Sequence, residues 1–461
     1  MKYNSTRGQI RDLSFSEAVM MGLASDGGLL LPQDIPHLSE QQLQALSRLD
    51  YKDLAYEIIS LYATDLPNED LRELVDKSYA AFDHPDVTPV VKYNDLYILE
   101  LFHGPTLAFK DVALQFLGNL FEYYLVQQDE KMNIVGATSG DTGSAAIAGI
   151  RGKDNMNIFI LYPAGRVSAV QEMQMATVPD ANVFNIAIDG TFDDAQAIVK
   201  DIFNDAEFKQ LHALGSINSI NWVRVLAQIV YYFYAYFRVA QQTGSQQVQF
   251  SVPTGNFGDI FAGYMAKEMG LPIPQLILAT NANNILSRFV NQGDYSLATV
   301  HQSLSPSMDI QVASNFERYL YYLYDGDTDQ VLDTMQRFKT DGEIRFEGNL
   351  LERIQGDFIS ATVDDPATLE VISAFYKKTG YILDPHTAVG VAAALTIGGD
   401  FPLVCLATAH PAKFPEAITR AISTPPPPVP AVEALRNLPQ RRECMVADLN
   451  IIKKYIGKNS I

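Results

Sequence analysis

Lys110 has the residue type and the setting for covalent chemistry. It lies in ELFHGPTLAFKDVALQFLGNLF, where the residues after it have the apolar pattern of a buried helix. Burial and the start of a helix both disfavour the ammonium form, so we expect a lowered pKa for Lys110. A neutral amine can form a Schiff base with an aldehyde. The alternative is a lysine whose side chain reaches water, which is the commoner case.

A glycine-containing turn after a predicted strand is a candidate anion site. In VPTGNFGDIFAGYMAKEMG the strand ends at Pro253, Gly255 and Gly258 follow, and a helix opens near Asp259. Glycines let backbone N–H groups converge on a phosphate, and the helix start adds partial positive charge. The turn matches neither a Walker loop nor the dinucleotide fingerprint Gly-x-Gly-x-x-Gly. A tight turn without a ligand is the alternative.

A second turn lies between a strand and an alanine-rich helix that begins near Gly143, in VGATSGDTGSAAIAGI. It contains four small polar residues, Thr138, Ser139, Asp141 and Thr142. Hydroxyl groups and free amides at a helix start can hold a carboxylate. The same residue types are favoured helix caps, and a cap is the simpler interpretation of this turn alone.

The elements that must position these residues follow a strand–helix rhythm from about residue 87. Strand-like runs alternate with helical patterns: LYILEL (96–101), MNIVGAT (132–138), NIFILYP (157–163), NVFNIAI (182–188), VQFSVP (248–253), QLILAT (275–280) and the start of PLVCLATAHPAKFPEAI (402–418). Strands separated by helices indicate parallel sheets, so the fold class is α/β. Because ligands of such folds collect at the carboxyl ends of strands, we expect a site between the two turns.

Changes in pattern divide the chain into three parts. Residues 1–86 contain amphipathic helical segments and predict a helical N-terminal domain. Residues 87–424 form an α/β region, with a small subdomain at roughly 131–215 and a large one from the remainder, although 290–375 is less regular and predicts inserted helices. The tail 425–461 begins with an extended proline run and is expected to be peripheral.

The composition excludes several classes of function. The 461 residues carry a formal net charge of −20, which would repel nucleic acid and anionic membranes. The apolar run at 225–237 is short for a bilayer span and is expected to be a buried helix. No apolar core of a signal peptide stands at the N-terminus.

Cysteines and histidines give no sign of a disulfide framework or a metal site. Cys405 and Cys444 are the only cysteines, and a reducing, cytoplasmic location fits best. The seven histidines are scattered, and DGDTDQ at 325–330 lacks the glycine and glutamate of a calcium loop. No metal is therefore expected.

Together the motifs resemble those of the tryptophan-synthase-β-like pyridoxal-phosphate enzymes, and the resemblance narrows to threonine synthases. The matching stretches are SEAVMMGLASDGGLLLP (16–32), FHGPTLAFKD (102–111), ATSGDTGSAA (137–146), SINSINWVRVLAQIVYYF (216–233), VPTGNFGDIFAG (252–263) and ATAHPAKF (407–414). They follow the order of that family, and the match weakens only at 290–375 and after the prolines. The resemblance implies fold type II of these enzymes: two parallel-sheet subdomains plus a helical N-terminal domain.

The resemblance also implies residues that bind the cofactor. Lys110 would carry pyridoxal 5'-phosphate as a Schiff base, and the hydroxyl of Thr408 would face the pyridine nitrogen. The cofactor phosphate would be held by the loop residues Gly255, Asn256, Phe257 and Asp259.

Substrate-binding residues are implied in two groups. The second turn would bind the substrate through Thr138, Ser139, Asp141 and Thr142, with Ser139 and Thr142 on its carboxylate. Candidates for the substrate phosphate, chosen by charge and segment, are Arg166, Ser168, Asn218, Arg224 and Lys413. Arg224 can equally be a member of a structural ion pair.

The implied activity is conversion of O-phospho-L-homoserine and water to L-threonine and phosphate by γ-elimination and β-addition, with the Lys110 amine as base. A phospho-lyase that releases 2-oxobutyrate, ammonia and phosphate is the alternative with the same cofactor, and FHGPTLAFKD with TAHPAKF favours the synthase. A non-catalytic binder would be expected to lose Lys110, and the absent dinucleotide fingerprint argues against a dehydrogenase. The expected binding partner is the small-molecule substrate, and no nucleic acid or membrane partner is expected. The sequence does not decide between a monomer and a homodimer.

Overall fold

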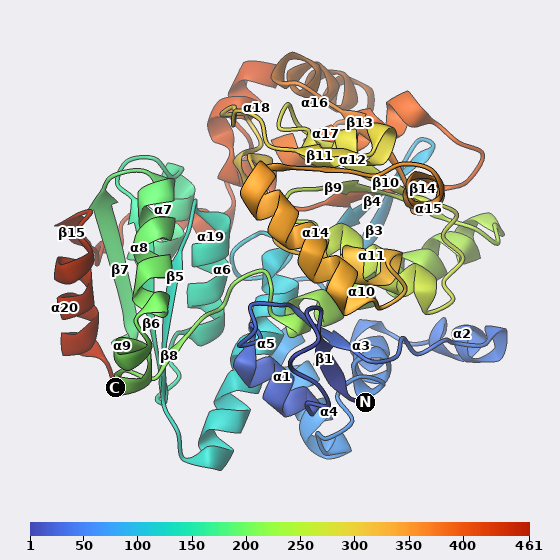
Figure 1. Cartoon of the computed structure of the whole chain (residues 1–461). Coiled ribbons are helices and arrows are strands. Elements are labelled where there is room, and N and C mark those ends of the chain that lie inside the picture. Colours follow the sequence, from blue (N-terminus) through green and yellow to red (C-terminus); the bar gives the residue numbers. More distant parts are fainter. The chain divides into compact units, whose positions relative to one another are not determined.

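Strands and helices alternate along the chain from Val90 onward, as the sequence predicts (Figure 1). The structure, a computed structural model, describes residues 1–461. Its contacts divide the chain into two units. Unit 1 consists of Met1–Asp76, Phe82–His103 and Ser219–Pro426, and unit 2 of Lys77–Ala81, Gly104–Asn218 and Pro427–Ile461. The domain boundaries predicted at residues 86 and 424 stay a prediction.

Unit 2 contains an all-parallel sheet of five strands in the order β15-β7-β6-β5-β8. These strands are β5 (Met132–Ala137), β6 (Met156–Pro163), β7 (Val183–Asp189), β8 (Leu214–Gly215) and β15 (Glu443–Val446). The helices are α5 (Lys110–Gln128), α6 (Asp141–Ile150), α7 (Ala169–Ala176), α8 (Phe192–Asn204), α9 (Ala206–Leu211), α19 (Pro430–Glu433) and α20 (Leu449–Asn459). Strand β6 is buried along its whole length, as expected for a central parallel strand.

The C-terminal tail packs on this unit as its edge strand and an outer helix. Strand β15 pairs in parallel with β7, and Ile452 and Ile456 of α20 pack against α8 and the strands (Figure 1). A strand of four residues and a single amphipathic helix give little signal alone. Their partner faces are formed only when the sheet has folded.

Helices α5 and α6 of unit 2 cross at very short distance. A Cβ on Gly118 would lie 2.1 Å from the carbonyl oxygen of Gly149, and one on Gly149 would lie 2.5 Å from that of Leu114. Only glycine allows two helix backbones to approach this closely. Because α5 begins at Lys110 and α6 at Asp141, the crossing fixes the two helix starts relative to each other.

Unit 1 is built on a six-stranded sheet in the order β13-β10-β9-β14-β4-β3, and only the edge strand β3 is antiparallel. Its strands are β3 (Val90–Tyr93), β4 (Leu96–Glu100), β9 (Gln249–Pro253), β10 (Leu276–Thr280), β13 (Phe358–Thr362) and β14 (Leu403–Ala407). Two small antiparallel pairs join β1 (Tyr3–Ser5) to β2 (Leu30–Pro32) and β11 (Asp294–Ser296) to β12 (Glu343–Arg345). The two predicted parallel sheets are thus confirmed.

The remaining helices surround this sheet and form the N-terminal part of the chain. They are α1 (Phe15–Met21), α2 (Glu40–Leu46), α3 (Tyr51–Ser60), α4 (Asn68–Tyr79), α10 (Trp222–Thr243), α11 (Gly258–Glu268), α12 (Ile285–Gln292), α13 (Phe316–Leu323), α14 (Thr328–Asp341), α15 (Asn349–Asp357), α16 (Asp365–Thr379), α17 (Pro385–Ile397) and α18 (Pro415–Ile422), with 3₁₀ turns η1 (Pro306–Met308) and η2 (Pro411–Lys413). The apolar run 225–237 is buried inside α10, as predicted. None of the helices combines the length and apolar character that a membrane span requires.

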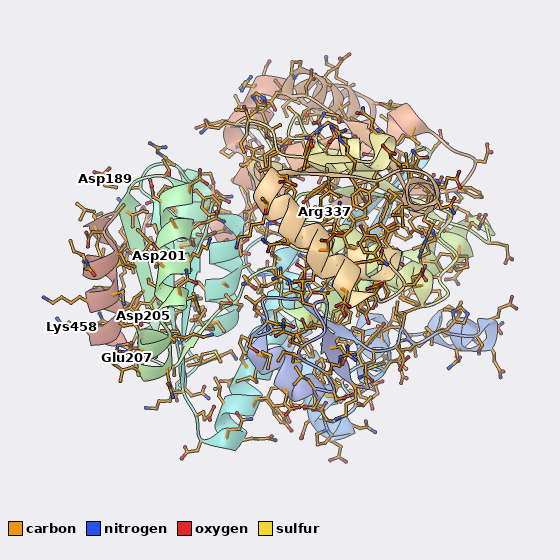
Figure 2. All side chains as sticks on the ribbon, viewed as in Figure 1. Asp189, Asp201, Asp205, Glu207, Arg337 and Lys458 are labelled. Carbon is orange, nitrogen blue, oxygen red and sulfur yellow. The ribbon has the colours of Figure 1, made fainter.

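Charged side chains of unit 2 project from the outer helices and strand ends. Figure 2 shows Asp189, Asp201 and Glu207 on the outside of this unit, and all three are exposed. Charges in such positions are screened by salt over about 10 Å. The overall negative charge is therefore compatible with an anion bound at a buried site.

Candidate active site

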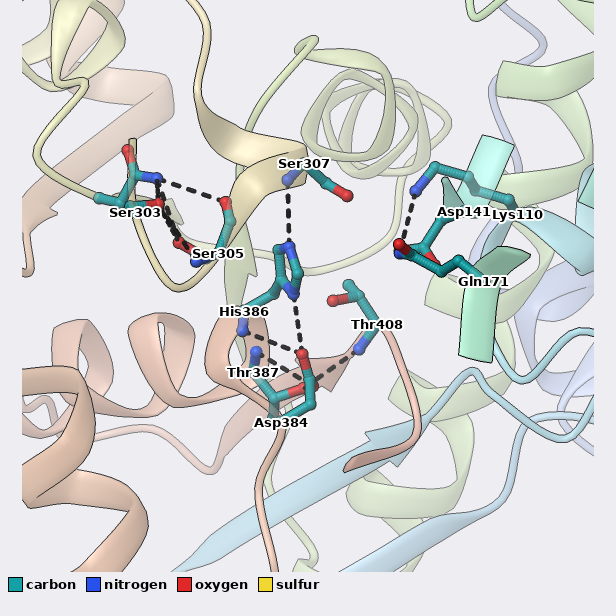
Figure 3. Close-up of polar contacts among 11 residues, drawn as sticks. Lys110, Asp141, Gln171, Ser303, Ser305, Ser307, Asp384, His386, Thr387 and Thr408 are labelled. Atoms are coloured by element: carbon teal, nitrogen blue, oxygen red, sulfur yellow. Dashed lines mark hydrogen bonds and ion pairs between the residues drawn. The ribbon is translucent and has the colours of Figure 1, made fainter. Parts of the chain in front are cut away.

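Lys110 is the first residue of α5, as predicted, and its side chain is 10% exposed. Its Nζ lies 4.8 Å from the centroid of the Phe109 ring and 3.9 Å from Oδ2 of Asp141 (Figure 3). The amine is therefore held between an aromatic face and a carboxylate. A neighbouring carboxylate favours a protonated amine, so the expected neutral form of the free amine stays a prediction.

The turn before Lys110 is closed by its neighbour Asp111. The carboxylate of Asp111 accepts hydrogen bonds from the backbone N–H of Thr106 at 2.8 Å and from its hydroxyl at 2.7 Å. Between them Leu107 has φ +62°, a left-handed conformation that is costly for a branched residue. The FHGPTLAFKD motif thus encodes a locked turn that positions Lys110, a role of Asp111 and Thr106 that the sequence did not reveal.

Asp141 is held in place from the opposite side by Gln171. The Nε2 of Gln171 donates to Oδ1 of Asp141 at 2.9 Å (Figure 3). Gln171 is itself fixed, because it forms a capping box with Ser168 at the start of α7. Asp141 therefore faces Lys110 with one oxygen while the other oxygen is engaged. Gln171 lies in no recognisable motif, so the sequence did not identify it as a site residue.

Of the other residues of this turn, one closes the turn and two are accessible to a ligand. The hydroxyl of Thr138 accepts from the N–H groups of Gly140 at 3.0 Å and Gly143 at 2.8 Å, so it closes the turn. Ser139 is exposed and Thr142 is half-buried. These two hydroxyl groups are accessible to a ligand carboxylate, as the sequence-based assignment requires.

Of the proposed phosphate-binding residues in unit 2, two lie beside this turn. Arg166 and Ser168 follow β6, the parallel neighbour of β5, so both turns occur at the same edge of the sheet. Arg166 is exposed, whereas the Ser168 hydroxyl accepts from the N–H of Gln171 at 3.2 Å. Asn218 is exposed at the end of a unit 2 segment.

In unit 1 the loop after β9 carries the second half of the predicted site. Phe257 adopts φ +62° and its ring is buried against Phe316, Tyr319 and Phe358. Its side chain thus belongs to the core, and only its backbone can contact a phosphate. The first N–H groups of α11 have no intrahelical partners, which suits them to bind an anion.

Asp259 is buried and engaged by α10. The hydroxyl groups of Tyr231 and Tyr232 donate to its Oδ1 at 2.5 and 2.8 Å. Burial, together with the charge of Asp259, raises the pKa of both tyrosines well above the usual value, so both hydroxyls stay protonated. The Asp259 carboxylate therefore anchors α11 to α10, and its backbone N–H is the group that a phosphate would meet.

Thr408 follows β14, which lies next to β9 and runs parallel to it. Thr408 and the loop after β9 are consequently at the same edge of the unit 1 sheet. Its N–H donates to the hydroxyl of Thr387 at 3.2 Å, and that hydroxyl donates to the carboxylate of Asp384 (Figure 3). Thr408 is buried, so its backbone position is fixed by a buried network.

Arg224 is a fully buried cation near the start of α10. Its Nε and Nη1 have no hydrogen-bond partner, and burial lowers its pKa to about 10, so it is charged at neutral pH. The start of α10 is tied to the loop after β9, because Nδ2 of Asn315 donates to the carbonyls of both Ser219 and Asn256. No carboxylate pairs with Arg224, unlike an ordinary structural ion pair. An unpaired buried cation is unfavourable without an anion, which fits the predicted binding of a phosphate by Arg224.

Lys413, the last proposed phosphate-binding residue, ends η2 and is fully buried in unit 1. Its side chain has no exposed surface that a ligand phosphate could contact, so its assignment to the phosphate stays a prediction.

Family models match the chain along almost its whole length. A model described as threonine synthase N terminus matches residues 2–79, one described as pyridoxal-phosphate dependent enzyme matches 82–408, and one described as threonine synthase, C-terminal, matches 387–456. The chain is 47% identical to the threonine synthase of Schizosaccharomyces pombe, over 92% of this chain and 90% of that protein. It is 46% identical to that of Pseudomonas aeruginosa, over 98% and 97%.

Solved structures agree with these relatives. The pyridoxal-phosphate-bound threonine synthase of Brucella melitensis superposes with a TM-score of 0.96 at 45% identity, covering 100% of this chain and 99% of that one. The yeast threonine synthase superposes with a TM-score of 0.95 at 44% identity, covering 99% and 98%. Sequence and fold agree over the full length, and the chain belongs to the threonine synthase family of pyridoxal-phosphate-dependent enzymes.

Proposed function

We propose that this protein converts O-phospho-L-homoserine and water to L-threonine and phosphate, with pyridoxal 5'-phosphate bound to Lys110. The observation that carries the proposal is the setting of Lys110 in a chain of this family. The lysine is buried at the start of an apolar helix and faces Asp141 at 3.9 Å. A structural lysine would more often extend to water.

The residues present fit the cofactor. The backbone N–H groups of the loop Gly255–Asp259 would bind its phosphate. The hydroxyl of Thr408 would donate to or accept from the pyridine nitrogen. When bound, pyridoxal phosphate withdraws electrons from the substrate and makes its Cα and Cβ protons removable.

Lys110 would move the protons. With the cofactor bound to the substrate amine, the Nζ of Lys110 would take the Cα proton of the substrate and later return one. Asp141, fixed by Gln171, would hold the protonated Nζ in place between these transfers. The turn with Ser139 and Thr142 would orient the substrate carboxylate.

The leaving phosphate requires its own cationic pocket. Arg166 and Ser168 would bind it, since both follow β6 at the edge of the sheet that also carries the 138–142 turn. Asn218, Arg224 and Lys413 stay further candidates. Overall, phosphate would leave Cγ, a proton would replace it there, and water would supply the hydroxyl group at Cβ of threonine.

A cytoplasmic location is part of the proposal. Cys405 is buried, Cys444 is exposed, and both are free thiols. An exposed free thiol is typical of proteins in a reducing compartment.

A product assay tests the function directly. Incubation with O-phospho-L-homoserine should release phosphate and threonine in equal amounts, with little 2-oxobutyrate. The Lys110→Ala variant should produce neither. Phosphate accompanied by equal amounts of 2-oxobutyrate and ammonia would instead identify a phospho-lyase.

A further inference from the structure

The loop after β9 packs against residues 305–318, a segment for which the sequence predicted no role. The carbonyl oxygen of Ser307 lies 2.5 Å from the position that a Cβ on Gly255 would occupy, so the two backbones are in direct contact. Ser307 is fixed in turn, because its N–H donates to Nε2 of His386 at 3.2 Å (Figure 3). His386 is held by Asp384 at 2.9 Å. The segment therefore forms a rigid support for the loop.

Asn315 makes the hydrogen bonds that set the orientation of this loop. Its backbone N–H and its Nδ2 both donate to the carbonyl of Asn256, at 3.0 and 3.1 Å. In a planar trans peptide the carbonyl and the next N–H point in opposite directions. Holding the Asn256 carbonyl on Asn315 therefore turns the N–H of Phe257 to the opposite side of the loop.

The second end of that peptide is also fixed. The ring of Phe257 lies 6.0 Å from that of Phe316 and 5.9 Å from that of Tyr319, both on α13. Because α13 begins directly after Asn315, one short stretch of chain holds both residues of the peptide. The left-handed backbone of Phe257 is sustained by these contacts.

Arg318 determines which end of the Asn315 amide faces the loop. Its Nη1 donates to Oδ1 of Asn315, while Nε and Nη2 donate to the carbonyl of Leu30 at 3.2 and 3.1 Å. A guanidinium has donors only, so it must contact the amide oxygen and leave the amide nitrogen for Asn256. Arg318 is fully buried, and burial lowers its pKa to about 9, so it stays a donor at neutral pH.

We infer that Asn315, oriented by Arg318, is a positioning residue that keeps the loop Gly255–Gly258 in the conformation that binds the cofactor phosphate. The inference rests on the proposed function, because it requires pyridoxal phosphate at this loop. It also gives the irregular region 290–375 a function in the site. Neither residue is proposed to take part in proton transfer.

The variant Asn315→Asp separates positioning from packing. It keeps the size of the side chain and gives Arg318 a charged acceptor, yet it removes the Nδ2 donor to the loop carbonyl of Asn256 and to the carbonyl of Ser219. If Asn315 served only to satisfy Arg318, this variant would behave as the wild type. The variant Asn315→Ala removes the same donor without adding charge, but it also removes the Oδ1 acceptor of Arg318, so it serves as a second comparison in which Arg318 loses a partner. Asn291→Asp, at an exposed site in the same region, is the charge control.

The readout is the preference for pyridoxal phosphate over pyridoxal, measured by titrating the full-length enzyme freed of cofactor. Both aldehydes can react with Lys110, but only one carries the phosphate. We expect the preference to fall at least about tenfold in Asn315→Asp and Asn315→Ala, because hydrogen bonds to a charged group are lost. Pyridoxal affinity should stay close to that of the wild type, and Asn291→Asp should keep the full preference.

Two results would overturn the inference while leaving the proposed function intact. One is an unchanged preference in folded variants of Asn315. The other is an equal loss of affinity for both aldehydes, which would indicate a purely structural residue. Failure of the wild-type enzyme to bind pyridoxal phosphate would instead contradict the proposed function itself.

Discussion

The carboxylate of Asp141 lies 3.9 Å from the amine of Lys110, and Gln171 holds the other carboxylate oxygen at 2.9 Å. The lysine and the acid come from the starts of two helices that cross at paired glycines. The geometry places a fixed negative charge beside the proposed base. It predicts that Asp141 affects catalysis more than attachment of the cofactor.

Asp141→Asn should retain the cofactor and lose activity. The Asn oxygen can still accept from Gln171, which turns the amide nitrogen toward Lys110 and removes the favourable charge. We expect kcat for threonine formation to fall roughly 10- to 100-fold, within the range for groups that assist acid–base steps. Asp154→Asn, which removes the same charge from an exposed position of unit 2, should leave kcat unchanged. Wild-type kcat in Asp141→Asn would show that the carboxylate has no part in the proton transfers.

Arg224→Met should change stability and binding in opposite directions. Removing an unpaired buried cation should stabilise the cofactor-free protein by about 1–4 kcal/mol, measured by urea unfolding. The same change should raise KM for O-phospho-L-homoserine, because Arg224 is a predicted ligand of the substrate phosphate. The matched variant is Arg318→Met, which strands the carbonyls of Leu30 and Ile220 and should destabilise the protein. If both variants destabilised the cofactor-free form equally, Arg224 would be a structural residue and not an anion-binding one.

Ser168→Ala should reveal two roles of one hydroxyl. It removes the N-cap of α7 and should lower the free energy of unfolding by about 1 kcal/mol. Thr191 caps α8 with the same capping box, so Thr191→Ala should cost a similar amount. Only Ser168→Ala should also raise KM for O-phospho-L-homoserine. An unchanged KM would leave Ser168 as a helix cap alone.

His103 should stabilise the fold in a pH-dependent way. Burial opposes its charge, but hydrogen bonds to Glu100 at 2.8 Å and Asp83 at 2.9 Å raise its pKa above the usual value. A raised folded pKa contributes stability that is complete below the unfolded pKa of about 6.5 and is lost as pH rises through the folded pKa. The stability difference between wild type and His103→Gln, from urea unfolding, should therefore be larger at pH 6 than at pH 9. A pH-independent difference would mean that His103 is neutral in the fold.

Much of the framework could be predicted because its signals are local. The strands that carry the site, β5, β9 and β14, are short apolar runs followed by small polar residues, and the helix start at Lys110 follows from the apolar pattern after it. Strand β13 was missed because Phe358–Thr362 is a half-buried edge strand without a continuous apolar run. Its identity as a strand depends on pairing with β10.

The supporting residues of the site could not be predicted, since their partners are distant in sequence. Asn315 lies 59 residues from Asn256, and Arg318 lies 288 residues from Leu30. The sequence also could not show that the Phe257 ring faces the core or that tyrosines of α10 bind Asp259. Phe257 and Asp259 were predicted to lie in the phosphate loop, and the structure leaves their backbone N–H groups for that role because their side chains are engaged elsewhere.

Gly255 is too closely packed for a substitution there to test phosphate binding. The first atom that a Cβ would meet is the Ser307 carbonyl oxygen, at 2.5 Å. Substitution of Gly255 would therefore displace the loop from its support and could not report on the phosphate alone, which makes Asn315 the better position to test.

Chemical trapping of the cofactor tests the central claim most directly. Borohydride reduction of the purified protein should fix pyridoxal phosphate to one lysine, and trypsin should then leave residues 93–131 as one uncleaved peptide carrying the added mass at Lys110. The Lys110→Ala variant should show no fixed cofactor. Fixation at another lysine, or a Lys110→Ala protein that still traps the cofactor and forms threonine, would contradict the account.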